Sequence, residues 1–75
     1  MKKETFGSAV KAIEESAKPD TMVRFDIYFK SGSQTTRLVN VELDKINVDL
    51  YRSTDNIGKE WYFSVDDVLM ISKFL

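Results

Sequence analysis

The chain has 75 residues, no cysteine and no histidine, and 11 Lys and Arg residues against 12 Asp and Glu residues, which gives a net charge of −1. Without thiols or imidazoles it has no disulfide, no thiolate metal site and no histidine general base, so we expect neither catalysis nor a metal or small-molecule cofactor. The charge balance also excludes the strongly basic surface with which proteins hold duplex DNA through its phosphates.

A length of 75 residues predicts one domain, residues 1–75, and 43% hydrophobic with 31% charged residues is the balance of a soluble folded domain. No apolar run approaches the ~20 residues that span a bilayer. The first residues, MKKETFGSAV, contain two lysines with no hydrophobic segment behind them, which is unlike a signal peptide. We therefore expect a cytoplasmic protein with no membrane partner.

The first element in chain order is a helix over about 4–18. Phe6, Val10, Ile13 and Ala17 recur at helical spacing and share one face. Pro19 cannot continue the helix and ends it. Because the apolar stripe is narrow, we expect the helix to lie on a sheet.

The period then changes from 3.6 to 2. Residues 22–30, MVRFDIYFK, alternate as a half-buried strand, and Gly32 supplies the turn that follows. Residues 35–43 alternate less strictly, because Leu38 faces away from Val39, Val41 and Leu43. A strand with apolar residues on both faces is often bent or covered on both sides.

The joint DKIN, residues 44–47, leads into a further strand in which Ile46, Val48 and Leu50 alternate with polar residues. STDNIGKE is a polar loop that contains Gly58, and EWYFSV reads as the next strand. The last segment, residues 65–75, fits either a short helix or a turn followed by a strand.

These elements predict a mostly β fold, with one N-terminal helix and five short antiparallel strands within about 22–75. Five short, bent strands in so few residues are typical of a small barrel. A small barrel often leaves a strand edge open, and an open edge can pair with another copy of the chain. Since the core of so short a chain is thin, we expect a homo-oligomer.

Two motifs in this order resemble the Sm/LSm family, the ring-forming RNA-binding proteins that include the bacterial chaperone Hfq. The first runs from Gly32 to Asp44, twelve residues later, which opens the family-like D-x-(M/I)-N as DKIN. The second corresponds to Ser64-Val65, two aspartates, and V-L-M-I over residues 68–71. The resemblance covers about residues 5–74 and implies a helix followed by an Sm-like, bent, five-stranded antiparallel barrel.

The resemblance further implies a homo-oligomeric ring of five to seven subunits that binds single-stranded RNA, or DNA, in RNA processing or chaperoning. In the family, the joints before the third and the fifth strand line the pore and hold unpaired bases. That places Asp44, Lys45, Asn47 and Ser64 in the RNA site, with Arg37 on a face of the ring against phosphates. The edges that close the ring would carry Trp61, Tyr62, Phe63, Leu69 and Ile71.

The chain departs from the family at three of these positions. Arg37 replaces a glycine where the second strand bends, Lys45 replaces a base-stacking residue, and Ser64-Val65 replaces an Arg-Gly pair. An oligomer of the same fold that binds a protein and no nucleic acid is therefore the alternative. Asn47 and Asp44 would then only satisfy the backbone of a turn.

A small hydrolase is a third class, for which no convergent acid–base set is visible. The tandem Asp66-Asp67 is expected to cap the turn before Val68. Tyr62 and Phe63 could stack on bases, but in a strand beside Trp61 they fit a core or an interface better.

Overall fold

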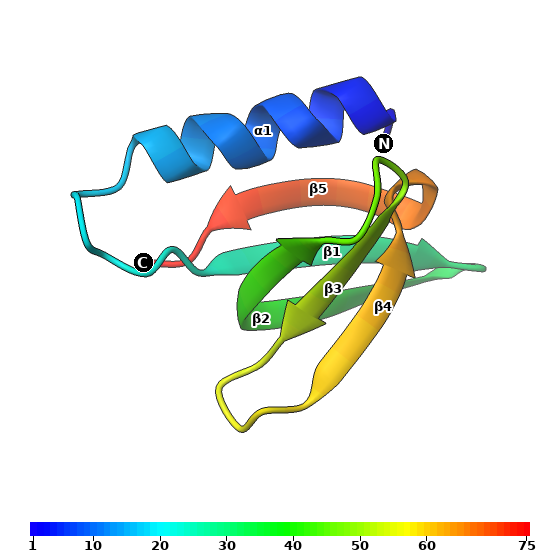
Figure 1. Cartoon of the computed structure of the whole chain (residues 1–75). Helices are drawn as coiled ribbons and strands as arrows, with labels where there is room; N and C mark the ends of the chain where they lie inside the picture. Colours follow the sequence, from blue (N-terminus) through cyan, green and yellow to red (C-terminus); the bar gives the residue numbers. More distant parts are fainter.

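A computed structural model describes residues 1–75, with the side chain of Ser31 excepted, and it has one helix followed by five strands (Figure 1). The mostly β fold predicted from the sequence is confirmed. The open choice for residues 65–75 is decided in favour of a 3-10 turn followed by a strand. The elements are α1 (Lys3–Glu15), β1 (Phe25–Ser31), β2 (Gln34–Lys45), β3 (Leu50–Thr54), β4 (Glu60–Ser64), η1 (Val65–Asp67) and β5 (Val68–Lys73).

The five strands form one antiparallel sheet in the order β4-β3-β2-β1-β5. The long strand β2 joins its two halves, pairing with β1 as far as Val41 and with β3 from Glu42 onward. The sheet is bent but not closed: β4 and β5 are its edges, and no ladder joins them in the part of the chain that the structure describes. Helix α1 lies along the sheet on the side of β5 (Figure 1).

A β-bulge bends β2 at Asn40. Phe25 pairs with Val41 and Ile27 with Leu38, so Val39 and Asn40 together face the single residue Asp26. The extra residue puts Leu38 and Val41 on the same face and turns Val39 outward, where it is 39% exposed. The prediction that Val39 and Val41 share a face is therefore wrong, because strict alternation does not allow for the extra residue of a bulge.

Asn40 adopts a left-handed backbone conformation, with φ of 58°, which asparagine tolerates better than most residues. Its amide donates to Asp26 Oδ1 at 3.0 Å, while its own side-chain oxygen accepts a hydrogen bond from Arg24 Nε. Arg24 also donates to the Asn40 carbonyl at 3.1 Å and lies 3.7 Å from Glu42 Oε2. The bend is thus held by two side chains, Arg24 and Asp26, at the start of the paired strand β1.

The core lies between α1 and the inner face of the sheet. Phe6 is fully buried, with its ring edge-on to Tyr51 at 4.8 Å and to Phe63 at 6.0 Å. The other buried hydrophobic residues are Val10, Phe25, Ile27, Val41, Tyr51, Val65 and Val68.

Helix α1 ends at Glu15, three residues before the predicted end. The Ser16 hydroxyl donates to the Ile13 carbonyl at 2.7 Å, which satisfies an acceptor of the last turn. Pro19 disfavours helical geometry at Lys18, so Ala17 lies in the connection to β1. No helix among the described residues is long and apolar enough to cross a membrane.

Candidate nucleic-acid interface

The DKIN joint ends in a tight loop, residues 46–49, between β2 and β3. Asn47 Oδ1 accepts hydrogen bonds from the amides of Asp49 and Leu50, each at 2.9 Å. The amides of Ile46 and Asn47 both donate to the Leu50 carbonyl. The side-chain oxygen of Asn47 therefore shapes the loop, while its two N–H donors enter none of the hydrogen bonds found among the described residues.

The loop also changes the predicted strand. Ile46 and Val48 are 48% and 50% exposed, and β3 begins only at Leu50. The predicted alternation of Ile46, Val48 and Leu50 in one strand is wrong, because Asn47 binds the amides that a strand would use in its ladder. Two exposed aliphatic side chains flank Asn47 as a result.

The turn before β5 lies beside this loop. The Val65 amide donates to the Asp49 carbonyl at 2.9 Å, and Ser64 is the strand partner of Leu50. The Ser64 hydroxyl accepts from the Asp66 amide at 3.3 Å, so Ser64 caps η1. We expected Asp66-Asp67 to cap this turn, but the cap is Ser64, and the two aspartates lie inside the turn. The structure thus brings Asn47 and Ser64 to the same rim of the sheet.

Asp44 is paired across the sheet with Arg52. A guanidinium nitrogen of Arg52 lies 2.8 Å from Asp44 Oδ2, and Arg52 Nε lies 3.5 Å from Glu60 Oε2. Hydrogen bonding to Asp44, and after it to Tyr62, raises the pKa of the Arg52 guanidinium above its ordinary value. Asp44 therefore holds β2 against β3, and its carboxylate is already engaged by a cation.

Lys45 lies at the end of β2, opposite Tyr51, with its side chain exposed. It lines one crevice of about 210 Å³ together with Lys3 and a second of about 320 Å³ together with Lys11, both against α1. Glu4 lines the first crevice and Glu14 the second. The lysines next to the Asn47 loop are therefore partly balanced by helix carboxylates.

The same rim also carries acidic residues. Asp49 lies in the loop, and Asp66 and Asp67 are exposed in η1. Their carboxylates repel phosphate, so a nucleic acid at this rim would be held through base edges more than through its backbone. Among the side chains that the structure describes, no three acidic residues gather closely enough to hold a metal ion.

Arg37 does not join Asn47. It is an exposed residue of β2 opposite Tyr28, with its guanidinium carbon 5.8 Å from the centre of that ring. Hydrogen bonding to Tyr28 raises the pKa of Arg37. It lines a groove of about 340 Å³ with Phe29, Trp61 and other residues of β1, β2 and β4.

Edge strand β4 is aromatic. Trp61 is 38% exposed with the Lys59 ammonium 4.2 Å from the centre of its ring, and Tyr62 is 60% exposed. Phe63 is half-buried and packs edge-on against Phe29 at 5.0 Å. Of the three aromatic residues assigned to an interface, Trp61 and Tyr62 reach the surface, and Phe63 mainly completes the core.

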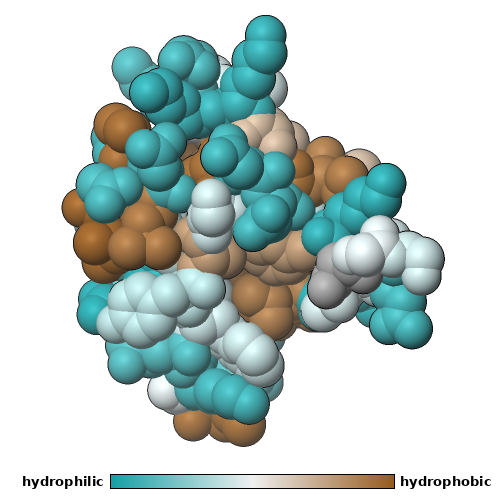
Figure 2. Space-filling model, turned by 90° about the vertical axis from the view of Figure 1, so that its right-hand side faces the viewer, coloured by the Kyte–Doolittle hydropathy of each residue, from teal (hydrophilic) through white to brown (hydrophobic). Residues whose placement is uncertain are grey.

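Edge strand β5 exposes aliphatic side chains. Leu69 and Met70 are 50% and 52% exposed, whereas Ile71 is half-buried opposite Ile27. Hydrophobic surface on the molecule is visible in Figure 2, where brown patches lie among the teal ones. Both open edges of the sheet therefore carry exposed apolar side chains.

Comparison of the chain with protein-family models, with curated proteins and with solved structures finds no match.

Sequence reasoning missed the helix lysines Lys3 and Lys11, which lie beside Lys45. Their helical spacing with Gly7 does put them on one stripe of α1. Which strands that stripe would face depends on how the helix docks, and no local pattern contains that information.

Proposed function

We propose that this protein is an Sm-like subunit that assembles into a homo-oligomeric ring through its two sheet edges. Strands β4 and β5 are of similar length, five and six residues, and each leaves one side of its backbone unpaired within the described chain. Edge-to-edge pairing of β4 with β5 of the next copy would satisfy those groups and repeat head to tail.

The side chains on these edges support the same assembly. Trp61 and Tyr62 on β4 and Leu69 and Met70 on β5 are apolar or aromatic, which is typical of interface cores. A chain of 75 residues buries only ~60–65% of the surface that it exposes when unfolded, so a shared interface would add stability that its own core lacks.

We propose further that the ring binds single-stranded RNA, or DNA, at the rim formed by the Asn47 loop and the Ser64 turn. The observation that carries this proposal is that only the side-chain oxygen of Asn47 is used in holding the loop. Its two N–H donors would remain available to a carbonyl on a base edge. Lys45, with Lys3 near it, would meet the adjacent phosphate. Exposed Ile46 and Val48 would cover the face of a base.

The acidic residues of the same rim favour a second candidate, a ring that binds a protein. Asp49, Asp66 and Asp67, together with a net charge of −1, suit a basic partner segment better than a polyanion. No catalytic step enters either candidate.

The experiment is native mass spectrometry of the protein alone and with a U-rich RNA or the matching DNA oligonucleotide. We expect masses of five to seven subunits, and RNA bound to them. Lys45→Ala with Asn47→Ala should abolish RNA binding and leave the ring intact. Lys30→Ala with Asn56→Ala makes the same change in charge and amide content at other exposed sites and should leave binding unchanged.

Leu69→Lys places a charge on the β5 edge and should yield monomers. A monomeric parent protein would overturn the ring. Rings that carry no RNA or DNA would overturn the nucleic-acid site and leave the protein-binding candidate. RNA binding that the double substitution leaves unchanged would place the RNA site elsewhere on the ring.

A further inference from the structure

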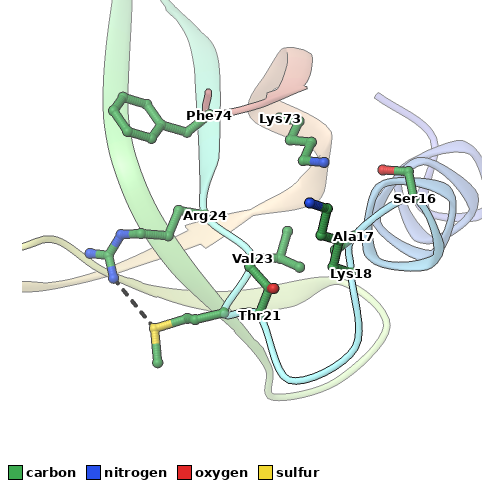
Figure 3. Close-up of a pocket in the computed structure, with 9 residues that line it drawn as sticks. Ser16, Ala17, Lys18, Thr21, Val23, Arg24, Lys73 and Phe74 are labelled. Carbon is green, nitrogen blue, oxygen red and sulfur yellow. Dashed lines mark hydrogen bonds between the residues drawn. The ribbon is translucent and has the colours of Figure 1, made fainter.

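A pocket of about 350 Å³ lies between the end of α1, the connection from α1 to β1, and the end of β5 (Figure 3). It is at the opposite end of the molecule from the Asn47 loop (Figure 1). Ala17 and Val23 give apolar wall beside Lys18 and Lys73, whereas the side chains of Arg24 and Phe74 extend away from the two lysines (Figure 3). Its volume is at the small end of the range for ligand pockets.

The two lysines of this pocket, Lys18 and Lys73, have no acidic residue beside them in its described lining. Their side-chain nitrogens point toward one another (Figure 3). Neither lysine enters any of the ion pairs found among the described side chains, and none of the described residues that line the pocket is acidic. Arg24 is different, because it already binds Asn40 and lies 3.7 Å from Glu42. The pocket thus holds two like charges that face each other beside an apolar wall.

We infer that this pocket binds a small organic anion, a phosphate or carboxylate group on a compact apolar body. An anion between Lys18 and Lys73 would replace their mutual repulsion with two charge-assisted hydrogen bonds. The Thr21 hydroxyl, in the same wall, can donate a third. The apolar body would lie against Val23, which is half-buried and lies beside the two lysines (Figure 3).

One feature opposes an anion here. The C-terminal end of α1 lies at the pocket and carries a partial negative charge of about half an elementary charge. The two ammonium groups carry a full charge each and point into the space, so the net field favours an anion. This inference is independent of the ring and of its nucleic-acid site.

The test is an amide NMR titration of the full chain at constant ionic strength with phenyl phosphate, phenylacetate and inorganic phosphate. We expect the Thr21, Lys73 and Phe74 amides to shift and to saturate. The apolar wall should make phenyl phosphate bind about tenfold more tightly than inorganic phosphate. Phenyl phosphate against phenylacetate then distinguishes a phosphate ligand from a carboxylate.

Lys18→Gln with Lys73→Gln should abolish the saturable shifts, and Lys30→Gln with Lys59→Gln, which changes the net charge equally outside the pocket, should keep them. Val23→Ala should lower the affinity for phenyl phosphate about threefold and leave that for inorganic phosphate unchanged. Shifts that never saturate, or that are the same in both lysine double variants, would overturn the site. Shifts at these amides with an oligonucleotide but with none of the three small anions would overturn the assignment to a small ligand.

Discussion

Replacing Asn40 tests the bulge that bends β2, because the side chain and the backbone of this residue make separable contributions. Asn40→Ala and Asn40→Gly both remove the oxygen that accepts from Arg24 Nε. Only glycine keeps easy access to the left-handed φ of 58°. The hydrogen bond from the residue-40 amide to Asp26 is unaffected in either variant.

The magnitudes follow from these contacts. Loss of the bond to the guanidinium costs about 1.5 kcal/mol, the low end for charged partners, because the Arg24 side chain is 24% exposed and keeps other partners. Glycine adds about 0.5–1 kcal/mol of unfolded-state entropy. Alanine adds about 1–2 kcal/mol of left-handed strain. We expect a loss of about 2–2.5 kcal/mol for glycine and about 2.5–3.5 kcal/mol for alanine, against a total of about 4–11 kcal/mol for 75 residues.

The assay is urea unfolding at a fixed protomer concentration, since association shifts apparent stability. Asn47 provides the matched control: it also uses its side-chain oxygen in backbone hydrogen bonds, but it is not among the residues with positive φ. At that position alanine should be no worse than glycine. If Asn40→Gly lowered the free energy of unfolding as much as Asn40→Ala, or more, that result would refute the left-handed conformation at the bulge.

Three further predictions concern the core. Phe6→Ala should lower the free energy of unfolding in urea by about 3–5 kcal/mol, more than Val10→Ala, because Phe6 is fully buried against two aromatic rings. An equal loss for the two variants would contradict this packing. Burial, and after it the charge of Glu14, raises the pKa of Tyr51, so the unfolded state loses this proton first as pH rises. The stability from neutral Tyr51 is complete below pH ~10 and is lost above it, by at most about 1.4 kcal/mol per pH unit. Tyr51→Phe should flatten that decline in urea titrations between pH 9 and pH ~11, and an unchanged slope would contradict the burial. Ser53 is fully buried, and its hydroxyl lies 3.4 Å from the Trp61 carbonyl. In thermal unfolding, Ser53→Ala should cost less than ~1 kcal/mol because this hydrogen bond is long, and Ser53→Val should cost about 1–3 kcal/mol because the larger side chain overpacks the site. A larger loss for alanine than for valine would exclude tight packing around Ser53.

Much of the secondary structure could be predicted locally. Phe6 and Val10 share the buried face of α1 because helical spacing fixes which side chains lie together. Phe25 and Ile27 are buried because strand alternation does the same with a period of two. Gly32 has a φ of 62°, as the predicted turn requires. These properties depend on neighbours within a few residues.

The candidate site was predictable in part. Asn47 was assigned to the joint between two strands, and the structure places it in the loop there. The Asn47 oxygen binds the Asp49 and Leu50 amides and so keeps Ile46 and Val48 out of the strand. This local pattern competes with the hydrogen bonds of a strand ladder. A side-chain pattern cannot decide that competition.

By itself, the sequence determined the order of the elements and most of the residues that face the core, because periodicity and turn residues act over short distances. Only the tertiary structure decided where β2 bends, since the bulge at Asn40 needs Asp26 and Arg24 from another segment. It also decided that the Asn47 loop meets the Ser64 turn and that Lys18 faces Lys73. Those groups are distant in the chain, and only the packing of the whole sheet against α1 brings them together.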